Sequence, residues 1–373
     1  MSTRRFSGVA LAIAASVGIA ACGSSSSSSS TTAAAPGSTS ASTTPASSAT
    51  GTINGAGSTL AAPIYQQWGS TLSKQGITLN YNPVGSGAGV AQLQSGTVDF
   101  AGSDPAMKPT EVAKAKGAVA QFPIAFGAIT VAYNLSGVKS GLKLDGKTIA
   151  DIYLGKVKTW SDPEIKALNP GMTLPSTSIT VVHRSDASGT TKGFATFLSD
   201  YSPAWTAAAG KPDKTVKWPT GTGAAKNAGV AASVKQTAGA IGYVEQAYAL
   251  QNGMTYASVK NSKGTFILPT LAATSAAADG ITVPPDLTIS AINSPNATAY
   301  PIVSQTFVLV YKDMCKAGVA KNAASAVKAL LSYGLGAGQQ VEQQLTYAPL
   351  PSSLLAKDQA QLGTLTCNGA ALS

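Results

Sequence analysis

The sequence is poor in charged residues, in aromatic residues and in histidine. Of its 373 residues, 11% are charged and 6% are aromatic, and there is one histidine. A single imidazole is too few for a zinc site built by the protein alone, so we expect no metal and no cofactor. The formal net charge is +10, yet no run of Lys and Arg with interleaved aromatic residues occurs, which argues against nucleic-acid binding. Gly-x-Ser-x-Gly and Cys-x-x-Cys are also absent, and with them the usual signals of a serine hydrolase and of a paired-cysteine site.

The apolar run at residues 8–21 is too short to cross a bilayer core of about 30 Å. It follows two arginines and ends in Ile-Ala-Ala-Cys at Cys22, which resembles a lipobox. This pattern predicts a lipoprotein signal peptide over residues 1–21 and a lipid on Cys22. Residues 23–51 contain only Gly, Ser, Thr, Ala and Pro, a composition that cannot bury a core. We therefore expect residues 22–51 to tether the protein to the outer face of the cytoplasmic membrane.

The most informative segment that is present follows a predicted buried strand at residues 179–182. It contains Arg184 and Asp186 and leads into Ser-Gly-Thr at residues 188–190, where a helix is predicted to begin. A helix start offers unpaired N–H groups and the positive end of the dipole, and both favour an anion. The guanidinium of Arg184 matches a tetrahedral oxyanion, and Asp186 can fix its orientation. The alternative is an ordinary turn with a serine N-cap and a surface ion pair.

Two other glycine-rich segments share this character. Gly-Ala-Gly-Ser-Thr-Leu at residues 55–60 and Gly-Ser-Gly-Ala-Gly-Val at residues 85–90 each follow a predicted strand and open a predicted helix. Glycines let an anion approach the backbone, and the hydroxyl groups donate beside it. Neither segment has the lysine of a P-loop, and such runs are more often simple turns. Together with Arg184, the three helix starts indicate a convergent anion site.

Five ordered motifs resemble the phosphate-binding lipoproteins of high-affinity phosphate ABC importers. The motifs lie at residues 55–65, 98–104, 144–156, 184–190 and 239–245. The resemblance implies an α/β fold with two lobes, the type II periplasmic-binding-protein fold, and a ligand in the cleft between the lobes. It places residues 52–128 and 250–373 in lobe I and residues 129–249 in lobe II.

The resemblance also implies a phosphate-binding set. Its members are Thr59, Leu60, Ser86, Asp104, Arg184, Asp186, Ser188, Gly189 and Thr190. Leu60 would act through its backbone N–H, and Asp186 would orient Arg184. A carboxylate such as Asp104 repels an anion unless the anion keeps a proton to donate, as phosphate does near neutral pH and sulfate does not. Asp104 is therefore expected to favour phosphate.

Elsewhere predicted strands and helices alternate, which is typical of an α/β protein. The β-rich run at residues 121–134 is long enough to cross from one lobe to the other. A further strand is predicted at residues 304–312, and helices are predicted at residues 110–116 and 319–333. Apart from Cys22, two cysteines remain, Cys315 and Cys367. They are an even number in a compartment that tolerates disulfides, so we hypothesise that they pair with each other.

These observations predict a non-enzymatic, extracytoplasmic protein that captures inorganic phosphate. It would deliver the ion to the permease and ATPase subunits of an ABC importer. One alternative is a phosphatase-like enzyme, which needs a nucleophile with a base, or metals. The single imidazole is His183, which strand alternation points away from the Arg184 side, so we interpret it as a structural or surface residue. The other alternative is a phosphate sensor or adhesin on the same fold.

Overall fold

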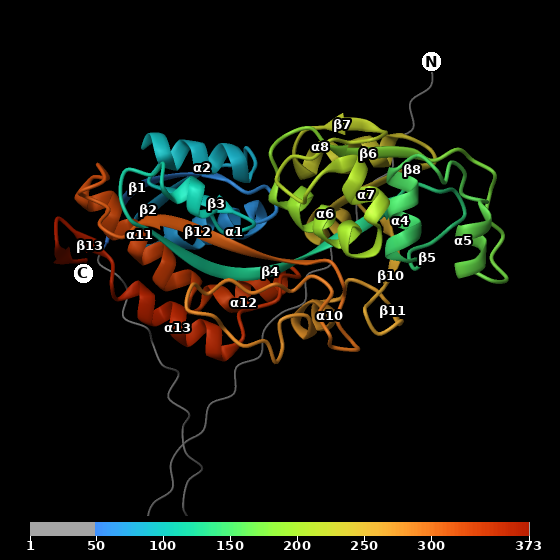
Figure 1. Ribbon diagram of the computed structural model, residues 1–373. Coiled ribbons are helices and arrows are strands. Elements are labelled where there is room, and N and C mark those ends of the chain that lie inside the picture. The colour runs from blue at the N-terminus through green and yellow to red at the C-terminus, as the bar shows by residue number, and fades with distance from the viewer. Residues whose placement is uncertain (1–48, 373) are drawn as a thin grey trace, which may run out of the picture. The chain divides into compact units, whose positions relative to one another are not determined.

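The computed structural model describes residues 49–372. The predicted signal peptide, Cys22 and nearly all of the predicted tether lie outside the described residues. Within residues 49–372, every helix is too short or too polar to cross a bilayer. The described residues form a mixed α/β structure around a nine-stranded sheet (Figure 1).

The strands of the main sheet run in the order β2, β1, β3, β12, β4, β8, β6 and β7, with β9 paired to one end of β4. They are β1 (Gly51–Gly57), β2 (Ile77–Asn82), β3 (Phe100–Ser103), β4 (Val119–Tyr133), β6 (Thr180–Arg184), β7 (Thr222–Ala224), β8 (Ala240–Glu245), β9 (Thr255–Tyr256) and β12 (Val303–Tyr311). The short strands outside it are β5 (Lys143–Leu144), β10 (Ser258–Lys260), β11 (Phe266–Ile267), β13 (Thr366–Cys367) and β14 (Ala370–Ala371).

Strand β4 is shared by two halves of the sheet. Residues 119–128 pair with β12, and residues 129–133 pair with β8. We call β1, β2, β3, β12 and residues 119–128 the β1 half, and residues 129–133 with β6, β7 and β8 the β8 half. A run buried on both faces needs apolar residues throughout rather than in alternation, which explains the near-continuous apolar sequence of β4. The predicted crossing strand is confirmed in position, while the lobe boundaries stay a prediction.

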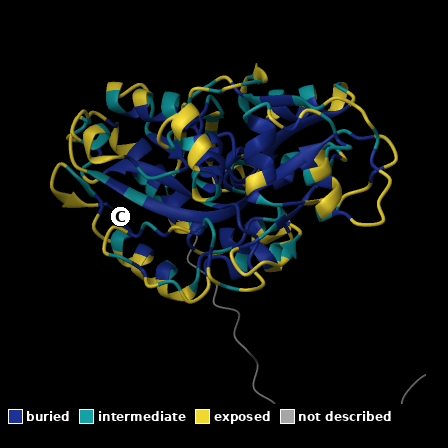
Figure 2. Ribbon diagram, turned by 45° about the vertical axis from the view of Figure 1, so that its right-hand side comes forward, coloured by how far each residue is buried: buried dark blue, intermediate teal, exposed yellow. Residues whose placement is uncertain are grey.

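Helices cover the faces of the sheet, and Figure 2 shows buried strands beneath helices whose outer turns are exposed. The helices are α1 (Ala62–Ser73), α2 (Ser86–Ser95), α3 (Pro109–Val112), α4 (Gly146–Tyr153), α5 (Pro163–Leu168), α6 (Gly189–Tyr201), α7 (Pro203–Ala209), α8 (Lys226–Gln236), α9 (Gln246–Gln251), α10 (Leu271–Ala276), α11 (Lys321–Gly334), α12 (Gly338–Gln344) and α13 (Ser352–Leu362). Helices α1, α2 and α11 pack on the β1 half, and α8 packs on β6 and β8. The tryptophans Trp68, Trp160 and Trp205 are fully buried in the core.

Two details concern expectations from the sequence. The helix predicted at residues 110–116 is wrong in length, because α3 ends at Val112 and the N–H of Lys116 donates to the hydroxyl of Tyr311 at 3.2 Å instead of continuing the helix. In the structure, Cys315 and Cys367 form a disulfide with an S–S distance of 1.98 Å, as the sequence hypothesis paired them.

Candidate functional site

The turn between β6 and α6 holds a buried ion pair. Arg184 ends β6, and its Nε donates to Oδ1 of Asp186 at 2.7 Å while a terminal nitrogen contacts Oδ2 at 2.5 Å. The side chain of Arg184 is 1% exposed. Burial alone would raise the pKa of Asp186, but the hydrogen bonds and charge of Arg184 hold it below its usual value. The two-point contact fixes the plane of the guanidinium and leaves its remaining N–H groups for other acceptors.

Helix α6 begins as the sequence predicted. The Oγ of Ser188 accepts a hydrogen bond from the N–H of Thr191 at 3.2 Å, so Ser188 is the N-cap and Gly189 and Thr190 form the first turn. All three residues are buried, although a helix start of this kind leaves backbone N–H groups without helical partners. The start of α6 therefore suits an anion.

A second helix start follows β1. The Oγ of Ser58 accepts from the N–H of Ala61 at 3.1 Å, and the carbonyl groups of the next two residues are held by tyrosines. The hydroxyl of Tyr248 donates to the carbonyl of Thr59 at 2.8 Å, and that of Tyr347 donates to the carbonyl of Leu60 at 2.7 Å. The first of these contacts fixes the peptide that carries the N–H of Leu60, an expected donor, and the second fixes the peptide that follows it.

Asp104 follows β3 and is 1% exposed. Its Oδ1 accepts from the hydroxyl of Thr306 in β12 at 2.8 Å, and its Oδ2 accepts from the hydroxyl of Ser86 at 3.3 Å. Burial raises the pKa of Asp104, and hydrogen bonds from Ser58, Thr306 and Ser86 with the charge of Arg184 oppose that rise only in part. The carboxylate is thus a buried acceptor surrounded by donors.

The two halves of the sheet meet at these residues. A Cβ on Gly189 would lie 1.3 Å from the carbonyl oxygen of Asp104 and 2.5 Å from its Oδ2, so this approach requires glycine. Asn227 of α8 links Thr59 to Thr190, and Arg184 contacts the hydroxyl of Thr190 at 3.4 Å. The nine residues expected from the sequence are therefore held near one another by direct contacts, and eight of them are buried, with Asp186 partly exposed.

Three residues of this cluster were missed by sequence reasoning. Ser58 lies in a recognised motif, where its neighbour Thr59 was chosen instead. Thr306 lies in the strand predicted at residues 304–312, which was given no functional role, and Asn227 lies in a segment without a motif. Neither position carried a local signal, since Thr306 is one of three consecutive polar residues that begin with Ser304.

Two charge pairs lie beside the cluster and join the segment that follows β3 to the segment that follows α7. Lys108 contacts Asp213 at 2.5 Å, and Lys214 contacts Glu111 at 2.8 Å. The second pair is the more enclosed, since the side chain of Lys214 is 7% exposed. The carbonyl of Lys214 also accepts from the N–H of Ser188 at 2.8 Å, which connects this pair to the start of α6.

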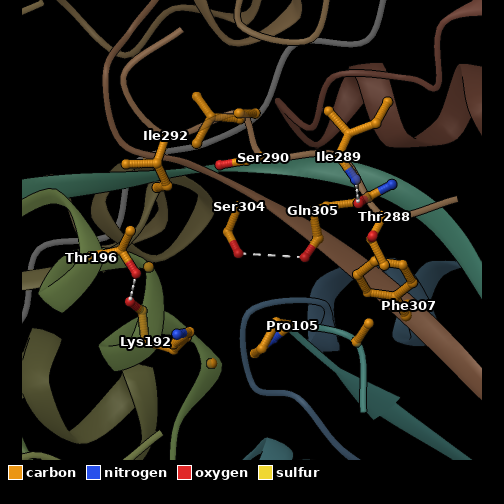
Figure 3. A pocket seen from close by; sticks show the side chains of 15 residues that line it. Pro105, Lys192, Thr196, Thr288, Ile289, Ser290, Ile292, Ser304, Gln305 and Phe307 are labelled. Atoms are coloured by element: carbon orange, nitrogen blue, oxygen red, sulfur yellow. Dashed lines mark hydrogen bonds between the residues drawn. The ribbon is translucent and has the colours of Figure 1, made fainter. Parts of the chain in front are cut away.

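A cavity of about 450 Å³ adjoins the other side of Gly189 (Figure 3). Lys192 and Thr196 of α6 face Phe307 of β12 and the segment at residues 288–292 across it. Its lysine is already engaged, because the ammonium of Lys192 donates to the carbonyl of Pro212 at 2.8 Å. This cavity lacks the convergent donors of the Asp104 cluster.

The chemistry of the cluster is that of an oxyanion site with one exception. Arg184, hydroxyl groups and helix-start N–H groups are donors, whereas Asp104 is a buried acceptor among them. Such a set suits a tetrahedral oxyanion that carries a proton, because that proton can be donated to the carboxylate. Among residues 49–372, no group of three or more His, Cys, Asp or Glu converges as metal ligands would. His183 lies flat on Trp218 with ring centroids 4.6 Å apart.

Known proteins with similar sequences carry a common description. The PBP superfamily domain matches residues 41–336 of this chain. The phosphate-binding protein PstS of Pasteurella multocida (strain Pm70) is 40% identical over 317 residues, covering 84% of this chain and 90% of that protein. The phosphate-binding protein PstS of Haemophilus influenzae (strain Rd) is 38% identical, covering 84% of this chain and 93% of that protein.

A solved structure agrees in fold. It is a high-affinity periplasmic phosphate-binding protein bound with phosphate, and it matches this chain with a TM-score of 0.70 at 24% identity. The match covers 87% of this chain and 96% of the other. The expected α/β fold of two-lobed binding proteins is thereby confirmed. The chain belongs to the PBP superfamily and, within it, to the family of PstS phosphate-binding proteins.

Proposed function

We propose that this protein captures inorganic phosphate outside the cytoplasm and delivers it to an ABC importer. The observation that carries the proposal is Asp104, a buried carboxylate set among the donors of an oxyanion site. An anion with a P–OH group satisfies this acceptor, and a fully ionised anion does not. The names of the PstS relatives support the same ligand.

Each expected residue has a role in this proposal. Arg184, oriented by Asp186, neutralises the phosphate and donates to it in a fixed plane. The hydroxyl groups of Thr59, Ser188 and Thr190 and the backbone N–H groups of Leu60 and Gly189 supply donors. The hydroxyl of Ser86 donates to Asp104 in the structure and would turn its proton to the ion. Asp104 accepts the proton that phosphate keeps.

The enclosed cluster implies that the two halves separate to admit the ion. We assign lobe I to residues 52–128 and 250–373 and lobe II to residues 129–249, as the resemblance implied. The contacts between Gly189 and Asp104 and the pairs at Lys108 and Lys214 then belong to the closed form. Phosphate binding would draw the lobes together because its ligands come from both.

Titration of the chain from residue 52 onward with phosphate, arsenate and sulfate tests the proposal. We expect one phosphate per molecule in calorimetry, competition by arsenate, which keeps a proton, and no competition by sulfate. Equal binding of sulfate and phosphate would contradict the assigned ligand. Absence of hydrolysis of a phosphomonoester by pure protein distinguishes the binding protein from a phosphatase-like enzyme.

We also propose that Cys22 carries lipid and anchors the protein to the outer face of the cytoplasmic membrane. The support is the apolar run that ends in Ile-Ala-Ala-Cys, followed by a polar tether. Cys22→Ala is expected to release the protein from the membrane fraction or to leave it unprocessed. Unchanged processing and fractionation of the variant would refute the anchor while leaving phosphate binding untouched.

A further inference from the structure

We propose that Asn227 is a positioning residue that makes two threonine hydroxyls, those of Thr59 and Thr190, obligatory donors to the bound anion. The inference rests on the proposed phosphate function and adds a residue that the resemblance does not supply. Asn227 lies in the first turn of α8 and is fully buried. Its role follows from the hydrogen bonds that it makes in both directions.

The amide of Asn227 is fixed in one orientation. Its Oδ1 accepts from the backbone N–H of Glu245 at 3.0 Å. Because a backbone N–H only donates, the atom that it contacts must be the amide oxygen, and the other atom must be the NH2 group. That group donates to Oγ1 of Thr59 at 2.9 Å and to Oγ1 of Thr190 at 3.3 Å.

The oxygen of each of the two hydroxyls already accepts two hydrogen bonds. A hydroxyl oxygen accepts two hydrogen bonds and donates one. Thr59 Oγ1 receives the amide and the backbone N–H of Asn227, the latter at 3.4 Å. Thr190 Oγ1 receives the amide of Asn227 and the guanidinium of Arg184 at 3.4 Å. Within the described residues neither hydroxyl has a protein acceptor for its own proton, so both protons are free for an anion.

The backbone conformation of Lys226, the residue before Asn227, also directs donors toward the cluster. Lys226 has a φ of 66°, in the left-handed region that non-glycine residues seldom adopt. Its N–H donates to Oδ1 of Asp186 at 2.9 Å, and the next N–H, that of Asn227, points to Thr59. A strained residue thus aims two successive donors at the partner of Arg184 and at a proposed ligand.

The arrangement predicts losses of phosphate affinity of different size for two substitutions of Asn227. Asn227→Asp keeps the contact with Glu245 but replaces the NH2 donors by an ionised acceptor. The hydroxyl protons of Thr59 and Thr190 would turn to that carboxylate, whose charge also repels the anion. Asn227→Ala merely removes the donors and leaves the hydroxyls free to rotate. We therefore expect Asn227→Asp to weaken phosphate binding by roughly 100-fold or more near pH 8, and Asn227→Ala by about tenfold.

The deciding measurement is phosphate affinity by calorimetry across pH, expressed at each pH as the ratio to the parent protein. The loss of affinity of Asn227→Asp relative to the parent should become smaller as pH falls, because the protonated carboxyl regains a donor. The loss of affinity of Asn227→Ala should stay constant across pH. Asn134→Asp is the matched control, since the amide of Asn134 donates to the carbonyl of Lys235 outside the cluster, at 2.9 Å. It should bind phosphate as the parent does.

Equal deficits of the Asp and Ala variants at every pH, or an Asp variant within threefold of the parent, would overturn the positioning role. A parent protein that does not bind phosphate would instead overturn the proposed function. If thermal unfolding shows that Asn227→Asp does not fold, Asn227→Ser replaces it: its short hydroxyl should leave the tenfold deficit of Asn227→Ala in place. Parent-like affinity of Asn227→Ser and Asn227→Ala would then exclude the role.

Discussion

At the scale of single residues, the role proposed for Asp104 is to select phosphate rather than to attract it. Asp104→Asn removes a negative charge, which favours any anion, and presents an NH2 donor where the acceptor was, which penalises a P–OH group. Both changes help sulfate and only one helps phosphate. The preference for phosphate over sulfate should fall by about 1.5–3 kcal/mol, the range for one lost charged hydrogen bond. Competition titrations measure the ratio directly.

Asp99→Asn is a matched control for this change, because Asp99 precedes β3 and its carboxylate accepts from the N–H of Asn54 at 2.8 Å, outside the cluster. The control should keep the parental preference. A variant of Asp104 that still rejects sulfate as the parent does would show that another group discriminates between the two ions.

Arg184 is the residue on which affinity should depend most. Arg184→Ala removes the cation of the site and leaves Asp186 with only backbone donors such as the N–H of Lys226. Breaking a buried pair in this way costs about 2–5 kcal/mol, so phosphate binding should become very weak. Arg184→Lys should recover little, because an ammonium cannot make the two-point contact with Asp186. Affinity of Arg184→Ala within twofold of the parent in calorimetry would place Arg184 outside the site.

The sequence could indicate those residues of the site whose chemistry is written in neighbouring positions. Arg184 and the start of α6 that follows it lie within one short segment, so the strand, the turn and the N-cap could be predicted from the same few residues. The contacts of Asn227 and Thr306 join residues that are far apart in the chain, and a single sequence carries no sign of such pairs. The position of Asp104 followed from the resemblance alone.

At the scale of elements, two charge pairs join residues 108–111 to residues 213–214, and we call these two pairs the clasp. Glu111→Gln leaves the enclosed ammonium of Lys214 without its carboxylate, which disfavours the closed form. We expect phosphate affinity to fall several-fold through faster release, which stopped-flow mixing would resolve. Lys108→Met removes the more exposed pair and should change affinity less than about twofold, since exposed pairs contribute little. Equal release rates in the parent and both variants would show that the clasp does not act on closure.

The long apolar or amphipathic elements were predicted well. Strands β4 and β12 and helix α11 agree with the sequence patterns to within about two residues. The two-residue strands were missed, because so short a stretch carries no periodicity and is defined by its partner. Helix α3 was predicted too long: after Val112 the N–H groups of Lys114 and Ala115 close tight turns, and the N–H of Lys116 donates to Tyr311.

At the scale of the whole molecule, buried carboxyls make stability depend on pH. Burial raises the pKa of Glu245 to about 8 and that of Asp358 to about 8, and it raises the pKa of Glu342 as well. An acid whose folded pKa lies above its unfolded value holds a proton that the unfolded chain releases. Its contribution to stability is therefore lost as pH rises from about 4 to about 8. Burial lowers the pKa of His183, so the contribution of this residue to stability has the opposite pH dependence and grows as pH rises.

Asp358→Asn isolates this effect away from the binding site. Oδ2 of Asp358 has no hydrogen-bond partner, so the neutral amide avoids the cost of a buried charge. The unfolding midpoint of the variant should exceed that of the parent by roughly 2–4 °C near pH 8 and approach it near pH 4. Calorimetric scans at both pH values provide the comparison, with Asp279→Asn, an exposed position, as the control. A variant less stable than the parent near pH 8 would contradict the assignment.

The position of β12 in the sheet sets the order in which a newly made chain can fold. β12 lies between β3 and β4 and pairs with both, although it is made long after them. A ribosome-bound chain that stops before Val303 lacks a strand from the middle of the sheet, not from its edge, and leaves the hydrogen-bonding groups of two others without that partner. We expect such late, non-local pairing to delay folding until β12 has been made. A partly synthesised chain should then stay unfolded, the form in which a polypeptide can be threaded through a secretion channel.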